Sequence, residues 1–172
     1  MITNVLLAHH WISPTALIVL VLLGPPLGAW LARRPRLAEV LALVALVPVG
    51  IVTLAPVRRE LYWRCEVAWT FPSIDRAELA ANVVLFVAPI LLATVALRRP
   101  LLAFASGSTL SAAIEAFQAL VPALGRSCST NDWMTNTMGA ALGAVLGGLA
   151  LLLARRRRDR PSTPEDHFIQ CG

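Results

Sequence analysis

Residues 111–139 have the sequence SAAIEAFQALVPALGRSCSTNDWMTNTMG, which holds most of the polar side chains that interrupt apolar sequence in this protein. On an α-helix, which turns by about 100° per residue, Ser111, Glu115 and Gln118 fall on one stripe. Five residues form a second stripe on the next helix: Asp132, Asn136, Gly139, Gly143 and Gly147. A short polar turn joins the two segments, so we expect antiparallel helices whose stripes face each other.

Glu115 is the carboxylate of this stretch that lies deepest in apolar sequence. It stands about seven residues from the end of its segment, or about 10 Å deep at 1.5 Å per residue. An ionisable group at the centre of a membrane span costs about 3 kcal/mol and normally pairs inside the bundle. Glu115 is therefore either a site residue, as a general base or a ligand anchor, or a structural carboxylate bonded to Ser111, Gln118, Asn82 or Arg126. Asn82 and Gln118 are likewise either ligand contacts or interhelical hydrogen-bonding groups.

The turn between the two stripes has the pattern of a helix start. Ser129 is an N-cap candidate, and Asp132 stands at capping-box spacing. A helix N-terminus offers N–H groups and partial positive charge, and Arg126 adds a full charge, so the arrangement favours an anion such as a phosphate or a carboxylate. The structural alternatives are an Asp132 that only caps the helix and a salt bridge from Arg126 to Glu115 or Asp132.

The chain resembles the VanZ-like family of bacterial membrane proteins over about residues 78–150. The resemblance rests on these positions: Asn82, Pro89, Ser111, Glu115, Gln118, Gly125, Arg126, Ser127, Asp132, Asn136, Thr137 and Gly139. Where the family usually has an acid, three residues after the arginine, this chain has Ser129, which does not compete with an anionic ligand. The resemblance implies a protein of a family linked to resistance against teicoplanin and lipoglycopeptides.

The composition predicts an integral membrane protein. The 172 residues are 57% hydrophobic and 15% charged, whereas soluble domains are nearer about 45–50% and 25%. Five apolar segments are each about as long as the roughly 20 residues that a spanning helix needs: 12–31, 37–57, 79–97, 101–124 and 133–154. We expect an all-α bundle of about five transmembrane helices, with residues 1–154 as one domain in the plasma membrane. The net charge of +5 does not indicate nucleic acid, because the arginines stand at the ends of apolar segments.

The arginines also predict the orientation of the helices. Ten of them lie at one side of the segments: Arg33, Arg34, Arg36, Arg98, Arg99, Arg155–Arg158 and Arg160. The positive-inside rule places that side in the cytoplasm, puts the N-terminus outside, and makes residues 155–172 a basic, disordered cytoplasmic tail. Trp11, Trp30 and Trp133 stand at predicted helix ends, as interface anchors do. The loop 58–78 either lies on the outer membrane surface or caps the bundle.

Two cysteines fall on the predicted outer side. Cys65 lies in the long loop and Cys128 beside Arg126, where an oxidising compartment permits a disulfide; the alternative is two unpaired thiols. Glycines spaced by four in the last helix predict close helix packing. No cofactor motif and no metal-ligand set is present, because the pair His9–His10 has no third ligand in reach.

The hypothesis that follows is a pocket between the segments 79–97, 101–124 and 133–154, open to the outer leaflet. It would hold a polar or anionic headgroup, such as that of a cell-envelope lipid or a lipoglycopeptide, among the membrane lipids. The proposed ligand contacts are Asn82, Ser111, Gln118, Arg126, Ser129 and Asn136, with Glu115 as base or acceptor. The alternatives are an intramembrane hydrolase or transferase with Glu115 and Asp132 as the acid/base pair, and a non-catalytic scaffold whose polar cluster only links helices.

Overall fold

The computed structural model describes residues 11–56, 65–70, 77–125 and 128–159. These residues form five α-helices and a short 3-10 turn: α2 (Ile12–Leu31), α3 (Pro35–Leu54), α4 (Ala77–Leu97), α5 (Pro100–Leu120), η1 (Pro122–Leu124) and α6 (Thr130–Arg158). The described part contains no strand; one isolated parallel bridge joins Glu66 and Ser129. The predicted all-α fold is therefore confirmed.

All five helices are long and apolar enough to cross a membrane. Their outer faces carry large apolar side chains, such as Leu101 and Leu120, whose exposed fractions are 84% and 79%. Exposed apolar surface of this extent is typical of a membrane-facing protein. The chain is a multi-pass membrane protein.

Two helix boundaries differ by four residues from the predicted segments, and the others differ by three or fewer. The fourth helix ends at Leu120 rather than Leu124, because the residue before a proline is disfavoured in the helical region; Val121 has φ −119° and ψ 78°, and η1 follows. The last helix runs to Arg158, so the first four residues of the predicted tail are helical. Cations in the last turn of a helix are favoured by its dipole. Residues 160–172 lie outside the described part.

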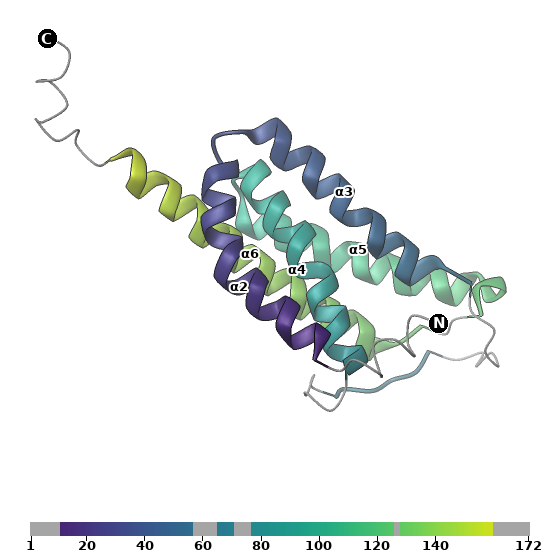
Figure 1. The fold of residues 1–172 in the computed structure, drawn as a ribbon. Coiled ribbons are helices and arrows are strands. Elements are labelled where there is room, and N and C mark those ends of the chain that lie inside the picture. Colours follow the sequence, from purple (N-terminus) through teal and green to yellow (C-terminus); the bar gives the residue numbers. More distant parts are fainter. Residues whose placement is uncertain (1–10, 57–64, 71–76, 126–127, 160–172) are drawn as a thin grey trace, which may run out of the picture.

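α4 is the centre of the bundle and packs against each of the other four helices (Figure 1). Its closest neighbour is α6, through Gly139, Gly143 and Gly147. A Cβ atom at Gly143 would lie 2.6 Å from the Val87 carbonyl oxygen, and one at Gly147 would lie 2.5 Å from the Thr94 Cβ. The predicted close packing is confirmed, but these glycines face α4 and not α5.

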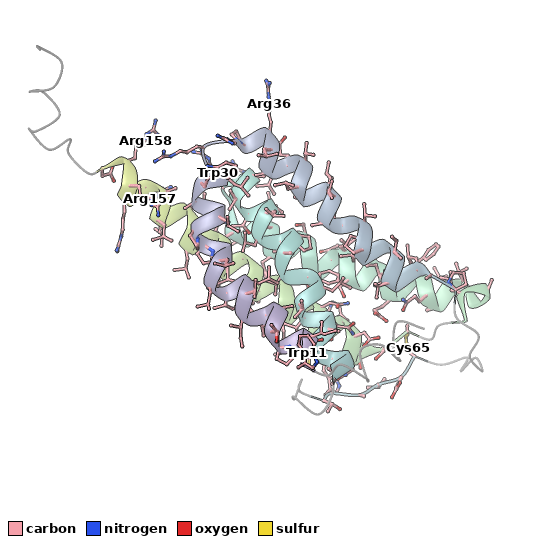
Figure 2. All side chains as sticks on the ribbon, in the orientation of Figure 1. Trp11, Trp30, Arg36, Cys65, Arg157 and Arg158 are labelled. Atoms are coloured by element: carbon pink, nitrogen blue, oxygen red, sulfur yellow. A yellow bond between two sulfur atoms is a disulfide. The ribbon has the colours of Figure 1, made fainter. Side chains whose placement is uncertain are left out.

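The described arginines gather at one end of the bundle. Figure 2 shows Arg36, Arg157 and Arg158 at the end where Trp30 lies, with Trp11 and Cys65 at the opposite end. This agrees with the prediction that the arginines beside the first and third connections and in the tail lie on the same side of the membrane. Which end faces the cytoplasm stays a prediction.

The three tryptophans at helix ends differ in their surroundings. Trp11 and Trp30 are exposed, and the Arg34 guanidinium lies 4.2 Å from the Trp30 ring centroid. Trp133 instead packs edge-on against Trp69, with ring centroids 6.5 Å apart, and its indole N–H is buried without a partner among the described residues. Trp133 is half-buried and contacts the loop segment that holds Trp69, and its role as an interface anchor stays a prediction.

Candidate functional site

Glu115 links α5 to the start of α6. Its side chain is buried, and its Oε2 accepts a hydrogen bond of 2.7 Å from the Ser129 backbone N–H. Ser129 is the N-cap of α6, as predicted, and its Oγ accepts from the Asp132 N–H at 3.4 Å. In a capping box, the third helical residue returns to the N-cap N–H. Here Glu115, on the neighbouring helix α5, accepts the hydrogen bond from the N-cap N–H in place of Asp132.

Asp132 is turned toward α4. The Asn82 amide nitrogen Nδ2 donates to Asp132 Oδ1 over 2.9 Å. An interhelical hydrogen bond of this kind joins two helices inside a membrane. Asn82 and Asp132, which are 50 residues apart in the chain, therefore belong to one cluster with Glu115.

Ser111 and Asn136 bring the two polar stripes into contact. Asn136 Nδ2 donates to Ser111 Oγ over 3.0 Å, and both side chains are almost completely buried. The other half of the amide is different, because Asn136 Oδ1 is buried and accepts no hydrogen bond from the described residues. An unsatisfied buried acceptor costs about 1–3 kcal/mol, so it calls for an explanation.

Gln118 is directed to a different helix from the one expected. Its Nε2 donates over 2.8 Å to the backbone oxygen of Thr53, in the last turn of α3. Carbonyls of a last helical turn have no partner within the helix. Gln118 therefore joins α5 to α3, and this contact favours the structural interpretation of its amide.

The segment Cys65–Thr70, called the strap below, covers the start of α6. Cys65 and Cys128 form a disulfide, with Cα atoms 4.8 Å apart. Beside it, the Glu66 N–H donates to the Cys128 oxygen at 3.0 Å, and the Thr130 N–H donates to the Glu66 oxygen at 3.1 Å. Of the two interpretations of the loop 58–78, its described part caps the bundle.

Two residues that the sequence analysis did not single out hold the rest of the strap. Thr130 Oγ1 accepts from the Ala68 N–H at 3.0 Å, and Asn131 Oδ1 accepts from the Thr70 N–H at 2.8 Å. Both stand in the polar turn beside Ser129. Their polarity could have drawn attention to them, but sequence alone could not name their partners.

These contacts occupy N–H groups at the start of α6 that were expected to bind an anion. The N–H groups of Ser129, Thr130 and Asp132 are bonded to Glu115, Glu66 and Ser129. The start of α6 is thus capped by the protein itself at these three positions. Arg126, the remaining cationic candidate, lies outside the described residues.

A sequence model of the VanZ/LLP1 family matches residues 11–152. The chain belongs to the VanZ/LLP1 family. The match begins before α2, so it extends well beyond the region 78–150 that carried the resemblance. No curated protein and no solved structure matches the chain.

Besides the polar cluster, this VanZ/LLP1 protein has an apolar groove between α3, α4 and α5, with a volume of about 530 Å³. Its lining includes Pro89, Gly107 and Leu110 but not Glu115, Asp132 or Asn136. The groove therefore differs from the predicted pocket between α4, α5 and α6. No group of three metal-ligating side chains occurs within the described ranges.

Proposed function

We propose that this VanZ/LLP1 protein binds the polar headgroup of a cell-envelope lipid at a cluster formed by Asn82, Ser111, Glu115, Asp132 and Asn136. The observation that carries the proposal is the Asn136 Oδ1 atom, which is buried and accepts no hydrogen bond from the described residues. A ligand hydroxyl or N–H group would supply the missing hydrogen.

The chemistry of the cluster favours a ligand rich in hydrogen-bond donors. The buried Asn136 Oδ1 is an acceptor without a partner among the described residues, and an amide oxygen can only accept a hydrogen bond. Sugar hydroxyls and peptide N–H groups are such donors. Arg126 would add an anion contact if the headgroup also carries a phosphate or a carboxylate.

The position of the cluster supports a lipid rather than a water-soluble ligand. Ser111 and Glu115 belong to α5 and Asn136 to α6, and both helices are long and apolar enough to span a membrane. Polar groups in such helices normally face the bundle interior or a pathway for a substrate. In the predicted orientation the cluster lies in the outer leaflet, where envelope-lipid headgroups are found.

In this proposal Ser129 and Gln118 position the site and do not contact the ligand. The Ser129 Oγ is used as the cap of α6, and the Gln118 amide is bonded to α3. Teicoplanin and lipoglycopeptide resistance would follow from binding of a lipid on which these antibiotics act or assemble.

The test uses Glu115→Gln and Asn136→Leu, with Thr109→Val as a control on the exposed face of α5. Each full-length variant is expressed in a susceptible host, its membrane abundance is measured, and lipids that purify with it are identified by mass spectrometry. We expect both site variants to reach normal abundance but to lose the bound lipid and any teicoplanin resistance, while Thr109→Val keeps both.

Three outcomes separate the alternatives. Resistance and lipid binding that survive in both site variants would favour the non-catalytic scaffold. Loss of membrane abundance together with resistance would favour a structural cluster. Accumulation of an intact lipid on Glu115→Gln, where the unmodified protein carries a cleaved one, would favour the hydrolase.

A further inference from the structure

The groove between α3, α4 and α5 has apolar walls and two polar residues. On α4 it extends from Pro89 to Leu97, about 12 Å at 1.5 Å per residue. Its volume of about 530 Å³ falls in the range of about 300–1,000 Å³ of ligand pockets. One of the polar residues, Ser106, already bonds its hydroxyl to the Ala103 oxygen over 2.9 Å. The other is Glu39.

Glu39 is an exposed carboxylate at the edge of the groove, beside its apolar walls. It lies four residues into α3, about 6 Å from its first residue, and it has no hydrogen-bond or ion-pair partner among the described residues. Ionisable groups inside membrane spans are costly and normally pair with an opposite charge. A cationic partner for Glu39 is therefore expected, and the surrounding bilayer is a source.

Arginines stand next to groove residues in the sequence at the end of the bundle where Glu39 lies. Arg98 and Arg99 directly follow the groove residue Leu97, and Arg36 stands three residues before Glu39, on the same face of α3. Arg98 is held in place there, because its Nη2 donates to the Ala32 oxygen over 2.9 Å. Figure 2 shows Arg36 at this end of the bundle, projecting away from it.

We propose that this groove is a binding site for phosphatidylethanolamine. One acyl chain lies along α4, the primary ammonium donates to Glu39, and the phosphate lies beside Arg98 and Arg99, which follow the groove residue Leu97. Basic groups between helices at a membrane surface are a known form of lipid headgroup site. The site is separate from the polar cluster and does not depend on the function proposed above.

The single acid in the groove decides between lipid classes. A purely anionic phosphatidylglycerol would place its headgroup beside the Glu39 carboxylate with no opposite charge to offer it. A phosphatidylcholine ammonium has no N–H group and cannot donate a charge-assisted hydrogen bond. Phosphatidylethanolamine alone among the three matches both the arginines and the acid.

The test is native mass spectrometry of the full-length protein in detergent, titrated with palmitoyl-oleoyl phosphatidylethanolamine, phosphatidylglycerol or phosphatidylcholine. We expect phosphatidylethanolamine to bind about tenfold more tightly than the other two, the size of one charge-assisted hydrogen bond. Glu39→Gln should remove this preference. Asp159→Asn, which removes an exposed acid outside the groove, should leave it unchanged.

Two further variants test the location. Ala93→Phe fills the groove, and Leu43→Trp adds bulk at its rim on a residue that is 66% exposed, so that at least one is expected to fold normally. Both should weaken binding of all three lipids, whereas Ala105→Phe, on an exposed α5 residue outside the lining, should not. The proposal is overturned if the unmodified protein prefers phosphatidylglycerol, if Glu39→Gln keeps the preference, or if neither groove variant weakens binding.

Discussion

Gly143→Ala should destabilise the protein, because the contact between α4 and α6 has no room for a methyl group. The added Cβ would lie 2.6 Å from the Val87 carbonyl oxygen and 3.1 Å from both the Ile90 Cβ and the Leu91 nitrogen. Two of these three atoms belong to the backbone, so no side-chain rotation relieves the contact. The helices must move apart by several tenths of an ångström.

The expected magnitude follows from two opposing terms. Overpacking of a well-packed core costs about 1–3 kcal/mol, and replacing glycine by alanine inside a helix contributes up to about 1 kcal/mol. We therefore expect a net loss of about 1–2 kcal/mol. Gly148 is the matched control on the same helix: its Cβ would meet only the Pro100 Cγ, at 3.8 Å. Gly148→Ala should be neutral or stabilising by up to about 1 kcal/mol.

The assay is reversible unfolding of the purified protein in mixed micelles, followed by circular dichroism. Equal stabilities for Gly143→Ala and Gly148→Ala would refute the close α4–α6 contact. Gly139→Ala provides a second readout, because its Cβ would collide with the Val83 carbonyl oxygen. Val83 follows Asn82, so that displacement should also weaken the bond between Asn82 and Asp132.

Three more predictions concern the two ends of the bundle. A reporter fused after Arg158 should behave as cytoplasmic and one inserted within residues 65–70 as external; the reverse pattern would contradict the arginine-based orientation. Alkylation of intact cells should label neither Cys65 nor Cys128 before reduction, and Cys128→Ser, which opens a loop with a sequence separation of 63, should cost on the order of 4 kcal/mol; full labelling without reductant would exclude the bond. Ser129→Ala should lower stability by about 0.5–2 kcal/mol through loss of the α6 cap, and an unchanged midpoint of unfolding would argue against that cap.

The spans could be predicted because each depends on local sequence. Long apolar segments give the helices, Pro122 explains why α5 stops at Leu120, and Ser129 marks the start of α6. All these features need only hydropathy, backbone chemistry and helical geometry. The predicted depth of Glu115 was too large, because α5 ends at Leu120, only five residues after it.

The partners of the polar side chains could not be predicted in the same way. Periodicity gives the face of a helix but not the helix that meets it, so the glycines of α6 were matched to α5 instead of α4. Gln118 was placed beside Glu115, although its amide reaches the Thr53 carbonyl of α3. The groove beside Glu39 depends on how three helices diverge, which no single segment encodes.

The disulfide gives the protein an unusual mechanical property. Because Cys65 and Cys128 enclose both α4 and α5, this hairpin is the interior of a covalent ring. A force applied to the two chain ends would be carried by the disulfide and not by the residues inside the ring. The hairpin would therefore leave the membrane without adding its residues to the length of the extended chain. Reduction would add about 220 Å of extended chain, at about 3.5 Å for each of the 63 residues of separation. Single-molecule extraction with and without reductant would therefore read the state of this bond directly as a change in contour length.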